Sequence, residues 1–525
     1  MSKSMKQLTQ FAACAIAALS VVACSSEDSA QQDNAKQNTA KGVATFDGSQ
    51  PSNDTRALTR TTATYTLGGD AKVFWSSADK IFVQDDANTF HQSNAANLYN
   101  PSNKAKATFS LASGSFTLNN REVRYTGENG TDANTVTIAS TQTQTTANDF
   151  SHLGTSGDCG TATATGSNGN YTFTLNHKAS YLCFVPRCMN TDLGPNIKLT
   201  KIKVTADQPI AGKYDFSTGS LAQKAGETYS NTVTLNTSDF SLNTTTSSLA
   251  TNGAYMVVAP GTYNFTITYT IKDPTTNVEG DIVKTVSSYN CQEGKINDIT
   301  ANLTPTNYDA NNYYMWDAQQ PYWQGYEWTH KNASWQPTVN GNTSSFYARN
   351  NTDNRYYHEG VGPFEASVNP LFTTLPNANE MAWYCKKGDP RWDGKRIWSM
   401  MGHLYKGGMW FKKKAYIPNF TNTHVPDNNS LDLRSQWRLI DNYASSIVPS
   451  ETEINEFFYL PAFGFYRDGK LYEVGKIGSY WSTTTAVPGY VNSEINAYNL
   501  DFLDNGYITV NNYGRSSGYS VQAFE

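Results

Sequence analysis

The segment YNFTITYTI at 263–271 decides the fold class. Each odd-numbered residue in it is large and apolar, and each even-numbered residue is polar. A period of two residues is typical of a β-strand with one buried face and one solvent-exposed face. The segment AYMVVA at 254–259 precedes it, and Pro260-Gly261 between the two suits a tight turn. We therefore expect these segments to form a β-hairpin.

Similar short runs recur from about residue 61 to residue 303, separated by Gly, Asn, Ser and Thr. The other strands that we predict are KVFW at 72–75, KIFVQ at 80–84, YTFTL at 171–175, SYLCFV at 180–185 and IKLTKIKV at 197–204. Helical periodicity is missing from this half of the chain. Antiparallel β-sandwiches are the simplest fold that buries one face of every such strand.

The composition changes after residue 303, because ten of the eleven tryptophans lie in 306–525. Two helix signals occur here. Asn377 followed by Glu380 has capping-box spacing, and Ser450 followed by Glu453 precedes an apolar run that ends at a proline. We therefore predict a separate α+β domain over 306–525.

The N-terminus has the features of an export signal. Lys3 and Lys6 precede 13 apolar or small residues at 11–23, too few to cross a hydrocarbon core about 30 Å thick. The next residue is Cys24, and VVAC at 21–24 resembles the lipobox of bacterial lipoproteins. The resemblance implies a diacylglycerol on Cys24 and no other cofactor. Residues 24–60 are polar, which predicts a disordered tether.

Charge and cysteine content exclude several classes of protein. Residues 1–23 contain two lysines and no acid, so without them the net charge of −5 becomes −7. A nucleic-acid partner is not expected for such a chain. Five cysteines follow Cys24 at irregular spacing, without a CxxC motif, so neither a disulfide framework nor a metal site is predicted. Tyr357-His358-Glu359 lacks the second histidine of HExxH. We expect no catalytic residues and no enzyme.

Residues of about 45–305 resemble the fimbrillin family, the lipoprotein-derived pilins of Bacteroidetes. The matching pieces are WSSADKIFV at 75–83, LNHKASYL at 175–182, IKV at 202–204, IAG at 210–212, APGTY at 259–263 and GKI at 294–296. The resemblance implies two transthyretin-like antiparallel β-sandwiches, which we place at 61–190 and 191–305.

The same resemblance implies maturation by an arginine-specific protease. Such a cut removes the first strand of a fimbrillin and leaves a groove that a strand of another subunit fills. Arg56 and Arg60 are the candidate sites, and VATF at 43–46 is the candidate first strand. The alternative is that both arginines are ordinary tether residues.

Residues 306–525 resemble the C-type-lectin-like domains of surface lipoproteins from the same bacteria. The matching pieces are NEMAWY at 379–384, GDP at 388–390, GGMW at 407–410, FYLPA at 458–462, GSYWST at 478–483 and RSSGYSV at 515–521. The resemblance implies that the first and last strands of the domain pair. The EPN, QPD and WND tripeptides of calcium-dependent lectins are missing, so we expect no metal.

Tryptophans of this domain are candidates for ligand contact, because aromatic side chains provide a large contact area. Trp383, Trp410 and Trp481 lie inside helix or strand signals, so we expect them in the core. The candidate ligand-binding residues lie in polar sequence and are Trp316, Trp323, Trp328, Trp335 and Trp392.

These observations and resemblances favour a surface-exposed lipoprotein of the outer membrane that matures into a fimbrial tip subunit. Its partners would be other fimbrial subunits, joined by strand donation, and a glycan or protein on a host or bacterial surface. The tip position follows from the C-terminal strand, which we expect to be locked in the lectin-like domain. The alternative is a lipoprotein that never polymerises and binds glycans for polysaccharide uptake.

Overall fold

The computed structural model describes residues 43–50, 65, 67–68, 74–100, 103–360, 362, 364–489 and 492–525. Cys24, Arg56 and Arg60 lie outside these residues. The described chain is mainly β, which confirms the fold class predicted from the period of two. No helix in the described part is long and apolar enough to cross a membrane.

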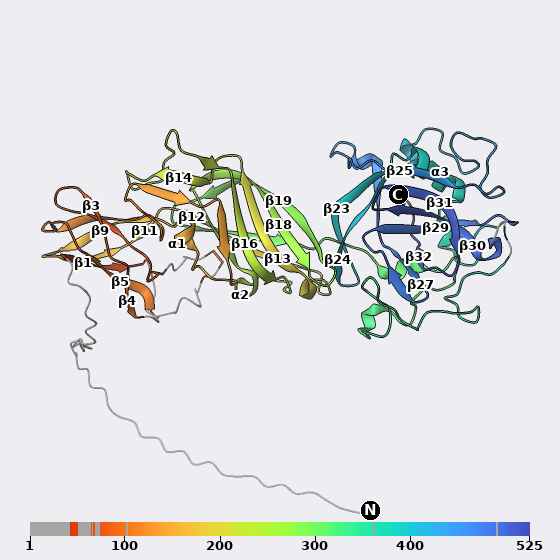
Figure 1. Cartoon of the computed structure of the whole chain (residues 1–525), viewed down its shortest axis with the longest axis horizontal. Helices are drawn as coiled ribbons and strands as arrows, with labels where there is room; N and C mark the ends of the chain where they lie inside the picture. The colour runs from red at the N-terminus through yellow and green to blue at the C-terminus, as the bar shows by residue number, and fades with distance from the viewer. Residues whose placement is uncertain are drawn as a thin grey trace, which may run out of the picture. The chain divides into compact units, whose positions relative to one another are not determined.

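The N-terminal sheet has the strand order β3-β2-β6-β9-β10-β1-β5-β4, with β11 added to β9 (Figure 1). Its strands are β1 (Ala44–Ser49), β2 (Phe82–Gln84), β3 (Phe90–Gln92), β4 (Asn97–Asn100), β5 (Asn103–Leu111), β6 (Asn120–Tyr125), β9 (Gly160–Ser167), β10 (Asn170–Thr174) and β11 (Asn176–His177). Trp75 is fully buried in its core, with its ring centroid 4.9 Å from that of Phe109 and 5.7 Å from that of Tyr125.

Three sheets share the central apolar core, in the orders β17-β12-β20, β19-β18-β13-β16-β8 and β15-β14-β7. Their strands are β7 (Thr135–Ile138), β8 (Thr141–Gln144), β12 (Ser180–Arg187), β13 (Lys198–Ala206), β14 (Ala211–Asp215), β15 (Tyr229–Ser230), β16 (Thr232–Ser241), β17 (Ala254–Val258), β18 (Gly261–Asp273), β19 (Val278–Cys291) and β20 (Ile296–Asn302). Two short helices accompany them, α1 (Leu153–Ser156) and α2 (Leu249–Asn252). β7 and β8 precede residue 190 but pair with β14 and β16, which follow it. The division into two sandwiches at that residue stays a prediction.

The prediction of a hairpin around Pro260-Gly261 is wrong. β17 pairs with β12 in one sheet, whereas β18 pairs with β13 and β19 in another. All five residues of β17 are buried, while burial alternates along most of β18. A strand covered on both faces and a strand exposed on one face therefore follow each other directly, and the turn passes between two sheets.

The described residues of 306–525, which we predict to be a separate domain and call the C-terminal domain, contain three sheets, in the orders β21-β23-β24-β26, β22-β32-β29-β30-β31-β25 and β27-β28. Their strands are β21 (Thr306–Asn307), β22 (Tyr313–Tyr314), β23 (Arg391–Met400), β24 (His403–Lys412), β25 (Ile440–Tyr443), β26 (Phe457–Pro461), β27 (Phe465–Arg467), β28 (Lys470–Tyr472), β29 (Ile477–Thr485), β30 (Asn496–Leu503), β31 (Tyr507–Gly514) and β32 (Tyr519–Ser520). The last strand, β32, pairs with β22, the second strand of this region, whereas the first strand, β21, pairs with β23. The expected pairing of the first and last strands is therefore shifted by one strand.

One of the two predicted helices is present. α3 (Ala378–Lys387) begins at a complete capping box, in which Glu380 N donates to Asn377 Oδ1 at 3.0 Å and Asn377 N donates to Glu380 Oε2 at 2.9 Å. The prediction of a helix after Ser450 is wrong. Ser450 N does donate to Glu453 Oε2 at 3.0 Å, but only a short 3-10 turn follows before β26. The apolar residues of β26 instead pair along β24.

Asn377→Ala should lower the free energy of unfolding of the C-terminal domain by about 1 kcal/mol, because α3 loses a side-chain cap at its N-terminus. Hydrogen exchange of the α3 amides measures this as faster exchange. Asn455→Ala changes an exposed asparagine outside the helix and serves as the control. Equal exchange in both variants would contradict the assignment of the cap.

Candidate functional site

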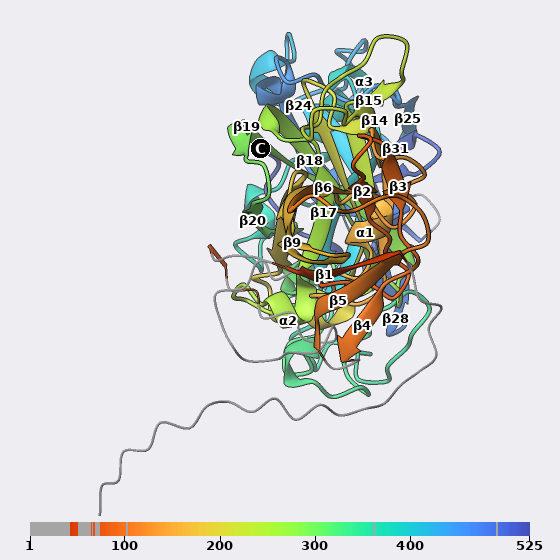
Figure 2. The same cartoon turned by 90° about the vertical axis from the view of Figure 1, so that its left-hand side faces the viewer.

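The candidate site is the channel occupied by β1, an interior strand of the N-terminal sheet. β1 runs parallel to β10 and antiparallel to β5, so that Phe46 lies opposite Tyr171 on one side and Phe109 on the other. Figure 2 shows β1 beside β5. The strand begins at Ala44, within the segment proposed at 43–46, and continues to Ser49. Both of its edges are therefore used in backbone hydrogen bonds.

The inward face of β1 consists of Ala44, Phe46 and Gly48, all of which are buried. The ring of Phe46 stacks on that of Tyr171, with centroids 4.7 Å apart and planes 7° apart, and meets Phe116 edge-on at 5.6 Å. Burial of such a side chain stabilises the folded chain by about 1.5–3 kcal/mol. Phe46 is thus the main apolar anchor of the strand.

Gly48 occupies a position with no room for a side chain. A Cβ atom there would lie 2.5 Å from Cζ of Phe173 and 3.1 Å from Cε2 of Phe109. The Trp75 indole N–H also donates to the Gly48 carbonyl at 3.2 Å. A glycine inside a strand often marks such a close approach. This sequence signal could have identified the position, but the strand predicted at 43–46 ends two residues before it.

A buried polar network holds the end of β1. Gln50 is 5% exposed, and its Oε1 lies 2.9 Å from Nε2 of His177. Nδ1 of His177 lies 2.7 Å from Oδ1 of Asp158, which also accepts a hydrogen bond from the hydroxyl of Tyr181. Burial raises the pKa of Tyr181 well above its usual value, and the charge of Asp158 raises it further, so this hydroxyl remains a donor.

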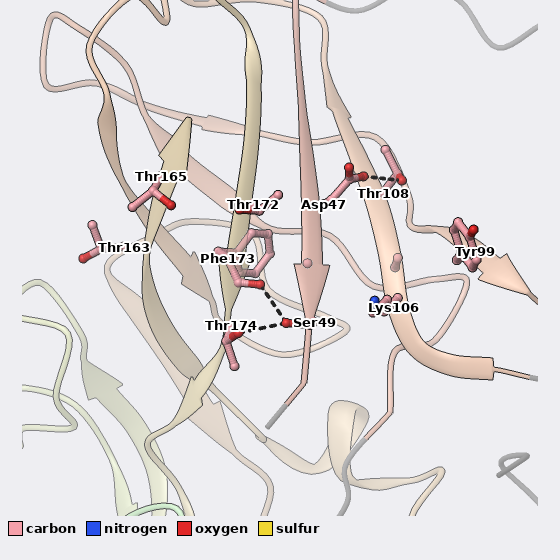
Figure 3. Close-up of a pocket in the computed structure, with 12 residues that line it drawn as sticks. Asp47, Ser49, Tyr99, Lys106, Thr108, Thr163, Thr165, Thr172, Phe173 and Thr174 are labelled. Carbon is pink, nitrogen blue, oxygen red and sulfur yellow. Dashed lines mark hydrogen bonds between the residues drawn. The ribbon is translucent and has the colours of Figure 1, made fainter. Parts of the chain in front are cut away.

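The outward face of β1 forms part of a shallow hollow of about 660 Å³ (Figure 3). Asp47 accepts a hydrogen bond from Thr108 Oγ1 at 2.6 Å, and the hydroxyls of Ser49 and Thr174 lie 2.8 Å apart. These polar groups bond to one another across three strands. Such pairing is typical of the solvated face of a sheet, and we assign no ligand to the hollow.

The structure corrects part of the expected aromatic surface. Trp316 and Trp323 are 0% and 2% exposed, so both belong to the core and neither is available to a ligand. Trp328, Trp335 and Trp392 are partly exposed. Three further tryptophans are buried as expected, namely Trp383, Trp410 and Trp481.

The partly exposed tryptophans belong to two different elements of the chain. Trp335 packs edge-on against Tyr326 at 5.3 Å, in the loop that also contains Trp328, whereas Trp392 lies on β23. Trp437, which was not among the predicted ligand-binding residues, is 37% exposed. Trp437 also lies in polar sequence, the feature from which we predicted exposed tryptophans. For Trp316 the same feature gave a wrong prediction.

Five cysteines lie in the described part of the chain, and all are buried and free: Cys159, Cys183, Cys188, Cys291 and Cys385. Within the same residues, no group of three or more His, Cys, Asp or Glu side chains is placed to hold a metal ion.

Comparison with known proteins gives only distant likeness. No protein-family model and no curated protein matches the chain. A candidate cell adhesion protein from Bacteroides ovatus is similar at 13% identity and a TM-score of 0.31, over 50% of this chain and 94% of that protein. A candidate cell adhesion protein from Bacteroides uniformis is similar at 15% identity and a TM-score of 0.29, over 50% of this chain and 94% of that protein. A candidate polysaccharide-binding protein from Bacteroides thetaiotaomicron is similar at 8% identity and a TM-score of 0.22, over 50% of this chain and 92% of that protein. TM-scores of this size do not establish a shared fold.

Gly48→Val should destabilise the N-terminal sheet by about 1–3 kcal/mol, because the new side chain must displace the ring of Phe173. Asp47→Val puts the same side chain on the exposed face of the same strand and is the matched control. Hydrogen exchange at the amides of β1, β5 and β10 should quicken in the Gly48 variant and change little in the control. Similar exchange in the two variants would show that Gly48 has room for a side chain.

Proposed function

We propose that this protein is an exported, acylated adhesin subunit that exchanges β1 for a strand of another subunit. The observation that supports the proposal is the position of β1. It is an interior strand, and the sequence that joins it to the following strand of the chain contains Arg56 and Arg60. After a cut at either arginine, only non-covalent contacts would hold β1 in the sheet.

The vacated channel would present the chemistry that binds an extended peptide. Removal of β1 uncovers backbone N–H and C=O groups along β5 and β10 together with the rings of Phe109, Tyr171 and Phe173. Unpaired strand edges next to apolar pockets favour addition of a strand. Other fimbrial subunits are the proposed donors.

The C-terminal domain is proposed to bind the target and not to donate a strand. β32 is paired with β22 and β29, and Tyr519 and Val521 are 2% and 1% exposed. Withdrawal of this strand would uncover the core of its own domain. A subunit that accepts a strand and donates none fits the tip of a fimbria. Its proposed ligand is a glycan or protein on a host or bacterial surface, bound without chemical change.

One observation favours a second function. In the uncut chain β1 fills the channel, and Phe46 is 0% exposed. A chain that stayed uncut would remain a monomer on its lipid anchor at Cys24. Such a protein would bind glycans at the outer membrane and support polysaccharide uptake.

Substitution of both candidate arginines, Arg56→Lys and Arg60→Lys, tests the two functions. Lysine keeps the positive charge but is not a substrate for an arginine-specific protease. Surface material from the unchanged chain should begin after Arg56 or Arg60 and run as a high-mass, detergent-resistant ladder, whereas the double variant should keep acylated Cys24 and run as a monomer.

Arg349→Lys, at an exposed arginine of the C-terminal domain, is the control and should polymerise normally. Mass spectrometry of the N-terminus and electrophoresis give the two readouts. Assembled material with an intact acylated N-terminus would refute maturation at these sites. A monomeric, acylated wild-type protein would favour the second function.

A further inference from the structure

The three inward positions of β1 differ in the space that surrounds them. Ala44 is 3% exposed and lies against Gly169, where an added Cβ would come within 3.8 Å of the alanine Cβ. Phe46 fills a pocket between Tyr171 and Phe116. Gly48 has the ring of Phe173 within contact distance of its missing side chain. The channel therefore has room for a small side chain at Ala44, for a large one at Phe46 and for none at Gly48.

The outward positions impose no comparable limit. Asp47 is exposed, and Thr45 and Ser49 are partly exposed. The backbone contacts are also independent of sequence, because the Trp75 indole and the edges of β5 and β10 bond to peptide groups. Backbone bonds give affinity to an added strand, and side-chain pockets give specificity.

The direction of an added strand is fixed as well. The edge of β10 bonds in a parallel pattern and the edge of β5 in an antiparallel pattern. The two patterns space their hydrogen bonds differently. A reversed strand would have to pair antiparallel with β10 and parallel with β5. It would also have to keep its glycine beside Phe173.

We propose that the channel selects a strand with a small residue, an aromatic residue and a glycine at alternate positions, inserted in the direction of β1. This inference rests on the proposed strand exchange and names the kind of partner that the exchange requires. A one-residue slip would turn the aromatic side chain toward solvent, and a two-residue slip would press it against Phe173. The glycine therefore sets the register.

The pattern also indicates where the strand comes from. Ala, Gly or Ser, then an aromatic residue two positions later, then glycine after two more, occurs once in the 525 residues, at Ala44, Phe46 and Gly48. The C-terminal segment YSVQAFE at 519–525 does not have it. The incoming strand is therefore a segment of another polypeptide and not the C-terminal strand of a second copy.

The test uses the full chain with a site-specific protease sequence inserted within 51–64. After cutting, labelled peptides of the sequence VATFDGSQ (residues 43–50) are added, and their uptake in place of β1 is followed by native mass spectrometry. The unchanged peptide should be taken up. Peptides with Gly48→Val or Phe46→Ser should bind at least about tenfold more weakly, the effect of 1.4 kcal/mol. Peptides with Asp47→Gln or Ser49→Gln have larger outward side chains that keep a hydrogen-bonding group, and they should bind within about threefold of the unchanged one.

The outcomes separate this inference from the proposed function. Equal uptake of the unchanged and Gly48→Val peptides, or of a peptide with the reversed sequence, would overturn the selection rule but leave strand exchange intact. Uptake of no peptide would refute exchange. The rule on side-chain size would then be tested in the uncut chain, where Gly48→Val and Phe46→Ser must quicken hydrogen exchange in β5 and β10 more than Asp47→Gln does. If they do not, that rule is wrong too.

Discussion

The N-terminal sheet depends on β1 as the strand that bridges β10 and β5. In the strand order β3-β2-β6-β9-β10-β1-β5-β4, the pair β4–β5 reaches the other described strands only through β1. Without this strand the hydrogen-bonded order is interrupted between β10 and β5, and the rings around Phe46 lose its cover. The sheet is therefore complete only with a strand in the channel. Any replacement has to restore both hydrogen-bond ladders and the packing at Phe46 and Gly48, so the contacts that stabilise the sheet are also those that discriminate among strands.

The sequence predicted which residues form strands better than which strands pair. The period of two at 263–271 specifies a strand with one dry face, and β18 has that face, but periodicity contains no information about the neighbouring strand. The continuous apolar run at 254–258 differs from it and is typical of a strand buried on both faces. Capping signals had a similar limit. Asn377 and Glu380 start a helix, whereas the contact between Ser450 and Glu453 forms in front of residues that the sheet requires.

The candidate aromatic site was less predictable, because local polarity does not report burial in a long loop. Trp316 stands in polar sequence, yet its indole N–H donates to the Ser482 carbonyl at 2.9 Å and its ring lies 5.0 Å from the guanidinium carbon of Arg515. Arg515 is itself 0% exposed, and this burial lowers its pKa to about 10. Contacts between residues so distant in the sequence decide which tryptophans face water, and no window of neighbouring residues contains them.

In the proposed function, the order of features along the chain would link anchoring to strand exchange. Cys24 precedes β1 in the sequence, and both candidate arginines follow β1. A cut at Arg56 or Arg60 would break the covalent link between the lipid-bearing segment with β1 and the rest of the chain, so that only the contacts of β1 in the channel would hold the two together. A cut molecule in the proposed pathway would stay at the membrane as long as β1 remains in the channel, and exchange of β1 for a donor strand would release it. Since β1 would then be the link between the subunit and its lipid, a donor strand would have to reach the channel while the subunit is still at the membrane surface.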